Sequence, residues 1–372
     1  MRDSVEEEIK FYLKKIDWLL LLFLSGILLA GFLTVKSVSI IEGNSLANKQ
    51  LLWYTIGFVF IFILFFLKDY RLLRKVVWWF YAFCIILLIL VMVVSHGKVH
   101  RWIHLGFISI QPSEFTKLAI ILALSDFFSR RIKERYTLQD IVLVGCILAI
   151  PLWLIKKQPD LGTAVLIAIV SATIIFFARL NLKTIIIIVT SIIIAFPVFY
   201  HSMLPYQRQR LEAFLHPDKY KQQGGYHINE SKIAVGTGGK WGQGFKHGIQ
   251  VHLRFLPESH TDFAFATFAE EWGFWGCCLL IACYLGIFWR GLSISKEAKD
   301  RFGVFLAFGI TALLFWQTFI NMIMVLGWAP VVGIPLPLVS YGGSSALVTL
   351  TSIGILLNIH KCHMETSSCL LE

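Results

Sequence analysis

The chain has 372 residues, of which 57% are hydrophobic and only 15% are charged. Soluble domains average about 25% charged residues, so this composition excludes a water-soluble enzyme, a disordered regulator and a small disulfide scaffold. The formal net charge of +11 would indicate nucleic acid as a partner if the protein were soluble. In a membrane protein the same excess records topology, because short cytoplasmic loops retain Lys and Arg.

Ten apolar stretches are long enough to cross the roughly 30 Å of a bilayer's hydrocarbon core as helices. The sequence therefore predicts an all-α, polytopic integral membrane protein that forms a single membrane domain over residues 1–372. The expected spans are 16–35, 51–67, 76–95, 113–128, 140–155, 162–179, 183–204, 262–289, 302–326 and 340–360.

The distribution of basic residues orients this bundle. If the N-terminus is cytoplasmic, the segments on the inner side carry 19 of the 34 Lys and Arg, and the short outer loops carry 6. Another 8 lie in the long loop at about 205–261, and loops of that length follow the positive-inside rule poorly. We therefore expect both termini in the cytoplasm, the long loop outside, membrane lipids as neighbours and no nucleic acid as a partner.

Ionisable residues inside or beside a span are costly in hydrocarbon and are functional candidates by default. Glu114 and Lys117 lie three residues apart in the fourth predicted span, so they can pair on one helix face. With Arg101 of the preceding outer loop, they either hold helices together or line a polar cleft near the outer surface. Asp160, in a turn between two spans, either caps the next helix or contributes to an anion-binding surface beside two lysines.

The long outer loop has no hydrophobic span and ends at a carboxylate. Its glycine-rich loop (residues 236–244) contains a lysine, but Trp follows that lysine where a nucleotide-binding loop needs Ser or Thr. Asp262 opens the eighth predicted span as either a capping carboxylate or a reactive group. His260 is expected to be a hydrogen-bonding neighbour, because no second His falls at zinc spacing. Further candidates for substrate contacts in this loop are Arg208, Arg210, Lys232 and Glu258.

An outer carboxylate among basic residues, on a bundle of hydrophobic helices, suits a lipid that carries an anionic, phosphorylated sugar headgroup. Pyrophosphate is a good leaving group, so glycosyl transfer from it needs a base for the acceptor hydroxyl and cations for the departing charge. Asp262 is the candidate base. Basic side chains or a divalent cation would hold the phosphates, and Mg²⁺ or Mn²⁺ suits such oxygen donors. The sequence identifies no metal ligands and no organic cofactor.

Six segments, in order along essentially the whole chain, resemble motifs of the SEDS family (shape, elongation, division and sporulation). Around Gly333 the chain is similar to the elongation branch of the family more than to its division branch. Glu230 and His227 depart from the family pattern, which usually has Gln at both positions. The matching segments are 101–103 (Arg-Trp-Ile), 111–114 (Gln-Pro-Ser-Glu) with Lys117, 158–163 (Gln-Pro-Asp-Leu-Gly-Thr), 231–234 (Ser-Lys-Ile-Ala) with glycines 236, 238 and 239, 256–263 (Leu-Pro-Glu-Ser-His-Thr-Asp-Phe), and 335–345.

This resemblance implies a peptidoglycan glycosyltransferase that polymerises lipid II on the outer face of the bacterial cytoplasmic membrane during cell elongation. It also implies a class B penicillin-binding protein, a transpeptidase, as partner. It places the family's essential aspartate at Asp262, and the polar groups of a central cavity at Glu114, Lys117 and Asp160. Two other functions stay open: a lipid II flippase or transporter, and a non-catalytic scaffold for the transpeptidase.

Overall fold

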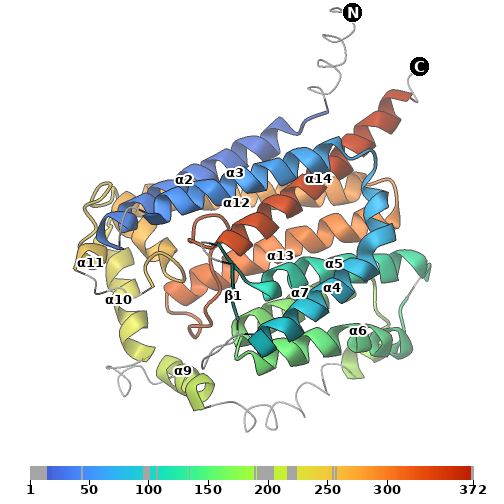
Figure 1. The fold of residues 1–372 in the computed structure, drawn as a ribbon, viewed down its shortest axis with the longest axis horizontal. Coiled ribbons are helices and arrows are strands. Elements are labelled where there is room, and N and C mark those ends of the chain that lie inside the picture. The colour runs from blue at the N-terminus through green and yellow to red at the C-terminus, as the bar shows by residue number, and fades with distance from the viewer. Residues whose placement is uncertain are drawn as a thin grey trace, which may run out of the picture.

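Long helices lie side by side in one bundle, and short helices gather at one end of it (Figure 1). The structure, a computed structural model, describes residues 15–42, 45–94, 101–105, 108–133, 135–187, 190, 205–215, 224–253, 255 and 258–369. The long helices are α2 (Trp18–Glu42), α3 (Ser45–Phe66), α4 (Leu73–Val94), α5 (Pro112–Arg130), α6 (Leu138–Lys157), α7 (Leu161–Phe177), α12 (Ala264–Glu297), α13 (Arg301–Val325) and α14 (Gly343–Cys369).

The shorter elements lie mostly in the outer loops of the predicted topology. The long loop contains α9 (Pro205–Leu215), α10 (Gly224–Thr237) and α11 (Ile249–His252), and a 3-10 turn, η1 (Tyr70–Leu72), precedes α4. Strands β1 (Ile103–Leu105) and β2 (Ile108–Ile110) form an antiparallel hairpin in which Ile103 pairs with Ile110.

The prediction of an all-α, polytopic membrane protein is confirmed. In the described part of the chain, seven helices are long and apolar enough to cross a membrane, and α7 is a shorter apolar helix. Helix α5 matches the expected fourth span, although four charged residues interrupt its apolar sequence. Most of the expected span at 183–204 lies outside the described residues.

The core of the bundle is formed around its last two helices. Within their apolar windows, 89% of the residues of α14 and 72% of those of α13 are buried, against 22% in the helix that includes α4. The start of α2 and the end of α14 lie at the same end of the bundle (Figure 1), where Lys15 Nζ lies 3.1 Å from Glu365 Oε1. The two described ends therefore share one side, and its cytoplasmic location stays a prediction.

Helix α12 is broken at Gly273, whose φ of 63° and ψ of −163° are not helical. The break leaves backbone groups without helical partners, and the glycine-rich loop supplies them. The N–H of Gln243 donates to the carbonyl of Glu270 at 2.9 Å, and the N–H of Phe274 donates to the carbonyl of Gly239 at 2.9 Å. Because unpaired backbone groups are costly away from water, these exchanged hydrogen bonds stabilise the break.

Glycines in the loop allow this close backbone contact. A Cβ atom at Gly242 would lie 2.1 Å from the carbonyl oxygen of Glu271, and one at Gly238 would lie 2.1 Å from that of Ala269. Gly242 also has a φ of +82°, which side chains with a Cβ rarely adopt. The glycines therefore serve packing against α12.

Two buried carboxylates of α12 fasten the same loop. Glu270 Oε1 accepts from the N–H of Gln250 at 2.9 Å, and Glu271 Oε1 accepts from the N–H of Lys246 at 3.2 Å. Glu271 also accepts from the hydroxyl of Ser37 on α2. The loop, the outer part of α12 and α2 are thus connected through charge-assisted hydrogen bonds, which are stronger than those between neutral groups.

We expect Gly242→Val to destabilise the protein, because its Cβ would overlap a carbonyl oxygen at a residue with positive φ. Strain of this kind costs about 1–3 kcal/mol, so thermal unfolding in detergent should show a lower midpoint. Gly236→Ala is the matched control, since a Cβ at Gly236 meets no atom of the described residues within 4 Å. Equal midpoints for the two variants would contradict the packing role of Gly242.

Candidate active site

Asp262 lies in the turn that leads into α12, at the outer end of the bundle in the predicted topology. The helix begins at Ala264 with Phe263 as its N-cap residue, and the cap makes no side-chain hydrogen bond. The interpretation of Asp262 as a capping carboxylate is therefore wrong, and the helix begins two residues later than the sequence predicts. The side chain is half-buried and stands beside the helix start.

Several predicted site residues act on this carboxyl group electrostatically. The pKa of Asp262 is raised to about 6, because burial and the charges of Glu258 and Asp160 raise it more than the cations of Arg210 and Arg101 lower it. The fold thus brings charged residues from four separate segments of the sequence together around Asp262. A carboxylate with a pKa near 6 is ionised at neutral pH and is a stronger base than an ordinary aspartate.

The segment 330–340 forms one wall of the site. A Cβ atom at Gly333 would lie 3.3 Å from Asp262 Oδ2 and 4.0 Å from a guanidinium nitrogen of Arg210. The same nitrogen donates a hydrogen bond to the carbonyl of Val331 at 3.2 Å. Gly333 has a φ of +72°, so this position favours glycine for its backbone as well as for the space beside the carboxylate.

Asp160 caps the next helix, as one of its two sequence interpretations predicts, and also contacts two outer segments. It is the N-cap of α7, where its Oδ1 accepts from the N–H of Thr163 at 3.3 Å. Its Oδ2 accepts from Gln111 Nε2 and from Ser113 Oγ, each at 3.2 Å. Arg101 lies 3.9 Å from its other oxygen, so Arg101 joins Asp160 directly.

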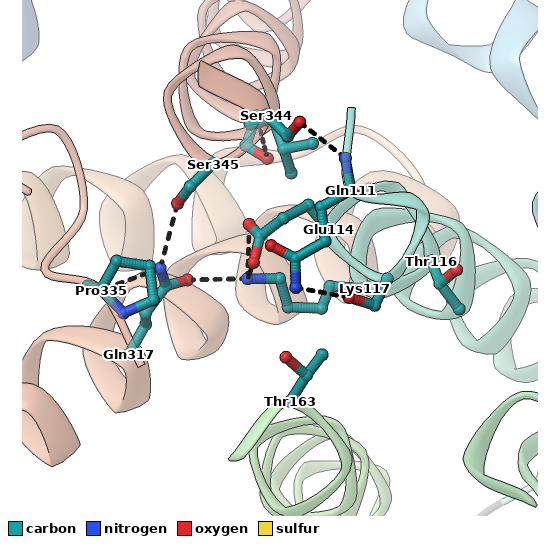
Figure 2. A network of polar contacts seen from close by, with 12 residues as sticks. Gln111, Glu114, Thr116, Lys117, Thr163, Gln317, Pro335, Ser344 and Ser345 are labelled. Atoms are coloured by element: carbon teal, nitrogen blue, oxygen red, sulfur yellow. Dashed lines mark hydrogen bonds and ion pairs between the residues drawn. The ribbon is translucent and has the colours of Figure 1, made fainter. Parts of the chain in front are cut away.

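Figure 2 shows a buried polar network centred on Lys117. Lys117 Nζ donates to Glu114 Oε1 at 2.8 Å and to Gln317 Oε1 at 3.3 Å, and it lies 2.8 Å from Glu114 Oε2. Gln317 Nε2 in turn donates to the carbonyl of Pro335 at 3.0 Å and to Ser345 Oγ at 3.3 Å. The predicted pair on one face of α5 is confirmed, and it also connects to α13 and to the start of α14.

Two carboxamides of α13 belong to the site, and sequence reasoning missed both. Gln317 completes the network of Lys117, and Asn321 lies one helical turn further along. Asn321 Nδ2 donates to the main-chain carbonyl of Asp262 at 2.9 Å and to that of Ile334 at 2.8 Å. The sequence did carry a signal for them, since two carboxamides stand four residues apart within an apolar span. Polar residues in such a span usually face the interior of the bundle.

The remaining predicted residues lie on the short helices and the turn around this site. Lys232, on α10, is exposed, and a Cβ atom at Gly327 would lie 2.8 Å from its Nζ. The ring of His260 lies with its centroid 5.9 Å from that of Tyr341. Arg208 lies half-buried on α9.

One of the two departures from the family pattern lies next to the turn that carries Asp262. The ring of His227 stacks on Phe263, with centroids 6.3 Å apart. Burial lowers the pKa of His227, and the cation of Arg210 lowers it further. A neutral imidazole is therefore expected against Phe263, the residue after the candidate base, at neutral pH.

A divalent cation has few protein ligands available in this structure. Among the described residues, no three His, Cys, Asp or Glu side chains lie close enough together to hold a metal ion. Mg²⁺, however, is commonly bound by one or two carboxylates together with substrate phosphates and water. A cation bound in this way would take most of its ligands from the phosphates of the substrate and from water.

Comparison with known proteins identifies the family. Residues 13–365 match the FtsW/RodA/SpoVE family of cell cycle proteins. The chain belongs to this family. The resemblance to the SEDS family predicted from sequence motifs is therefore confirmed over nearly the whole chain.

Similar proteins include peptidoglycan glycosyltransferases. The chain is 40% identical to the peptidoglycan glycosyltransferase MrdB of Escherichia coli strain K12 over 284 residues, which cover 75% of this chain and 76% of MrdB. It is 36% identical to MrdB of Helicobacter pylori over 350 residues, covering 92% and 89%.

Solved structures share the fold. A chain from a peptidoglycan synthase complex that coordinates polymerisation and crosslinking has a TM-score of 0.80 at 28% identity, covering 94% of this chain and 98% of that one. The rod shape determining protein RodA of Thermus thermophilus has a TM-score of 0.69 at 25% identity, covering 93% and 96%.

We expect Lys117→Met to lower stability, because it leaves the carboxylate of Glu114 buried without its cation. Removing one partner of a buried ion pair costs about 3–5 kcal/mol, which thermal unfolding in detergent would detect. The double variant Glu114→Gln with Lys117→Met should recover much of this loss. Lys299→Met, at an exposed position, is the matched control, and a loss of the same size there would contradict the prediction.

Proposed function

We propose that this protein, a peptidoglycan glycosyltransferase of the FtsW/RodA/SpoVE family, polymerises lipid II with Asp262 as the general base. The observation that carries this assignment is a half-buried carboxyl group whose pKa is raised to about 6 beside Arg210 and Arg101. It lies at the end of an apolar helical bundle, where a lipid-linked sugar can enter from the bilayer while its phosphates meet the cations.

In the proposed reaction, Asp262 accepts the proton of an acceptor sugar hydroxyl. The hydroxyl oxygen forms a bond to the anomeric carbon of the donor sugar as the bond from that carbon to the pyrophosphate oxygen breaks. Arg210 and Arg101 stabilise the negative charge that develops on the leaving pyrophosphate. The products are a glycan strand longer by one disaccharide, lipid pyrophosphate, and a protonated Asp262 that returns its proton to water.

We propose that a divalent cation, Mg²⁺ or Mn²⁺, binds with the phosphates of the substrate. When bound, it would neutralise phosphate charge as a Lewis acid. The predicted substrate-binding group extends this site: Glu114, Lys117 and Asp160 within the bundle, and Arg208, Lys232 and His260 at its outer end.

We further propose that the protein lies in the bacterial cytoplasmic membrane, with both termini inside and Asp262 facing outward. The positive-inside distribution of Lys and Arg supports this orientation. The names of the MrdB and RodA relatives support a role in cell elongation. The similarity to a chain of a peptidoglycan synthase complex supports a transpeptidase partner of the penicillin-binding class.

Purified protein incubated with lipid II and Mg²⁺, with and without such a partner, tests the activity. We expect glycan strands from the wild type and at least a hundredfold lower rate from Asp262→Asn, which keeps the shape of the side chain but removes the base. Strands from Asp262→Asn at the wild-type rate would overturn the assignment of the base. If the wild type moves lipid II across the membrane of vesicles and forms no polymer, the protein is a flippase. If the wild type neither polymerises nor moves lipid II, it is a scaffold.

We also expect polymerisation to depend on pH through Asp262. The base is active when ionised, so the rate should fall as the pH drops through about 6, the value to which burial and neighbouring charge raise the pKa. Glu258→Gln removes one of the negative charges that raise it, so the midpoint should move to lower pH. A rate profile that is flat from pH 8 to pH 5, or an unmoved midpoint in Glu258→Gln, would contradict this expectation.

A further inference from the structure

The inner face of α13 carries two buried carboxamides that contact both halves of the active site. Gln317 and Asn321 are 2% and 0% exposed and lie one helical turn apart on the same face. Gln317 contacts Lys117 and the carbonyl of Pro335, and Asn321 contacts the carbonyl of Asp262. This α13 polar pair (Gln317 and Asn321) therefore connects the buried network of α5 to the turn that bears the base.

Asn321 uses both hydrogens of its amide group on irregular backbone. One goes to the carbonyl of Asp262 at 2.9 Å and the other to the carbonyl of Ile334 at 2.8 Å. These carbonyls belong to the turn before α12 and to the wall formed by 330–340. A single rigid side chain thus sets the separation between the base and Gly333, the residue against which its carboxylate packs.

A second side chain, Ser340 of the wall formed by 330–340, fastens the same turn. Ser340 Oγ donates to the carbonyl of Thr261 at 2.5 Å and accepts from the N–H of Leu336 at 2.8 Å. The N–H of Tyr341 donates to the carbonyl of His260 at 2.7 Å. Consecutive carbonyls of the turn are therefore held from two directions, by α13 and by the segment that leads into α14.

We propose that Asn321 is a positioning residue for Asp262, and that Ser340 is its counterpart in the segment 330–340. This inference rests on the proposed function, because it assigns to Asn321 the placement of the carboxylate that serves as the base. Asn321 contacts the main-chain carbonyl of Asp262, so it acts on the reaction through that residue.

The placement matters for two physical reasons. Proton transfer requires the base within hydrogen-bond reach of the acceptor hydroxyl, and a displacement of about 1 Å can cost roughly a hundredfold in rate. The raised pKa of Asp262 also depends on burial and on the nearby charge of Glu258. A turn released from α13 would expose the carboxyl group to water, and its pKa would fall toward the ordinary value for Asp.

The test compares Asn321→Leu, which removes both donors at similar volume, with the wild type and with Thr318→Val. Thr318 lies on α13 one turn before Asn321 and is 3% exposed. Within the described part of the chain its hydroxyl has no hydrogen-bond partner, so Thr318→Val is a matched control for a buried polar group. Lipid II polymerisation is measured as kcat, KM and rate against pH, and thermal unfolding in detergent checks that each variant is folded.

We expect Asn321→Leu to lower kcat about 10- to 100-fold with KM within about twofold of wild type, and to move the acid midpoint of the rate profile below that of wild type. Thr318→Val should match wild type in kcat, in KM and in the midpoint of the rate profile. A folded Asn321→Leu variant with an unmoved midpoint and an unchanged kcat would overturn the proposal. So would equal losses in Thr318→Val, which would indicate a general effect of repacking α13.

Ser340→Ala provides an independent variant if Asn321→Leu does not fold. It removes the donor to Thr261 with a smaller change in volume, and we expect the same fall in kcat and the same direction of the pH shift. Wild-type behaviour of Ser340→Ala in that case would overturn the proposal. Asp262→Asn distinguishes failure of the proposed base from failure of the proposed positioning. If Asp262→Asn is inactive while Asn321→Leu and Ser340→Ala behave as wild type, Asp262 remains the base and only the positioning role fails.

Discussion

The pairing of backbone groups in irregular segments is the constraint on which this site depends. Here the base stands on a turn, and its wall is an extended segment with few regular hydrogen bonds. Such backbone is tolerated near hydrocarbon only where the protein supplies partners, and Asn321, Ser340 and Gln317 supply them.

The same constraint explains the electrostatics around Asp262. Because the turn is held from two sides, its carboxyl group is kept half-buried near Glu258 and Asp160, and burial raises its pKa. Arg210 and Arg101 come from separate outer segments and oppose this effect without cancelling it. The result is a carboxylate that is ionised at neutral pH and close to cations that can meet phosphate. Position and basicity are thus two results of one set of hydrogen bonds.

Sequence patterns predicted the helices and most of the charged groups for identifiable reasons. Long apolar runs predict membrane spans whatever the packing of the helices. Charged residues in or beside these runs are rare, and this rarity identified Glu114, Lys117 and Asp262 as candidates. Gln317 and Asn321 were missed because uncharged carboxamides are less conspicuous in an apolar span than charged residues, although their four-residue spacing places them on one helix face. The start of α12 was predicted two residues too early, at Asp262 and not at Ala264. The preceding turn is held by contacts from segments distant in the sequence, and a local sequence pattern does not record such contacts.

The break in α12 has a consequence for how the protein is assembled during synthesis. The residues that satisfy the break lie in the glycine-rich loop, which precedes α12 in the chain, and Gln243 and Gly239 are 27 and 35 residues from their hydrogen-bond partners Glu270 and Phe274. Contacts this local form early and at low entropic cost. In the proposed topology the loop reaches the outer surface before α12 has emerged, so the first part of that helix can fold onto the loop as it arrives. The stretch from Ala264 to Gly273 then folds together with the extracytoplasmic loop, before the rest of α12.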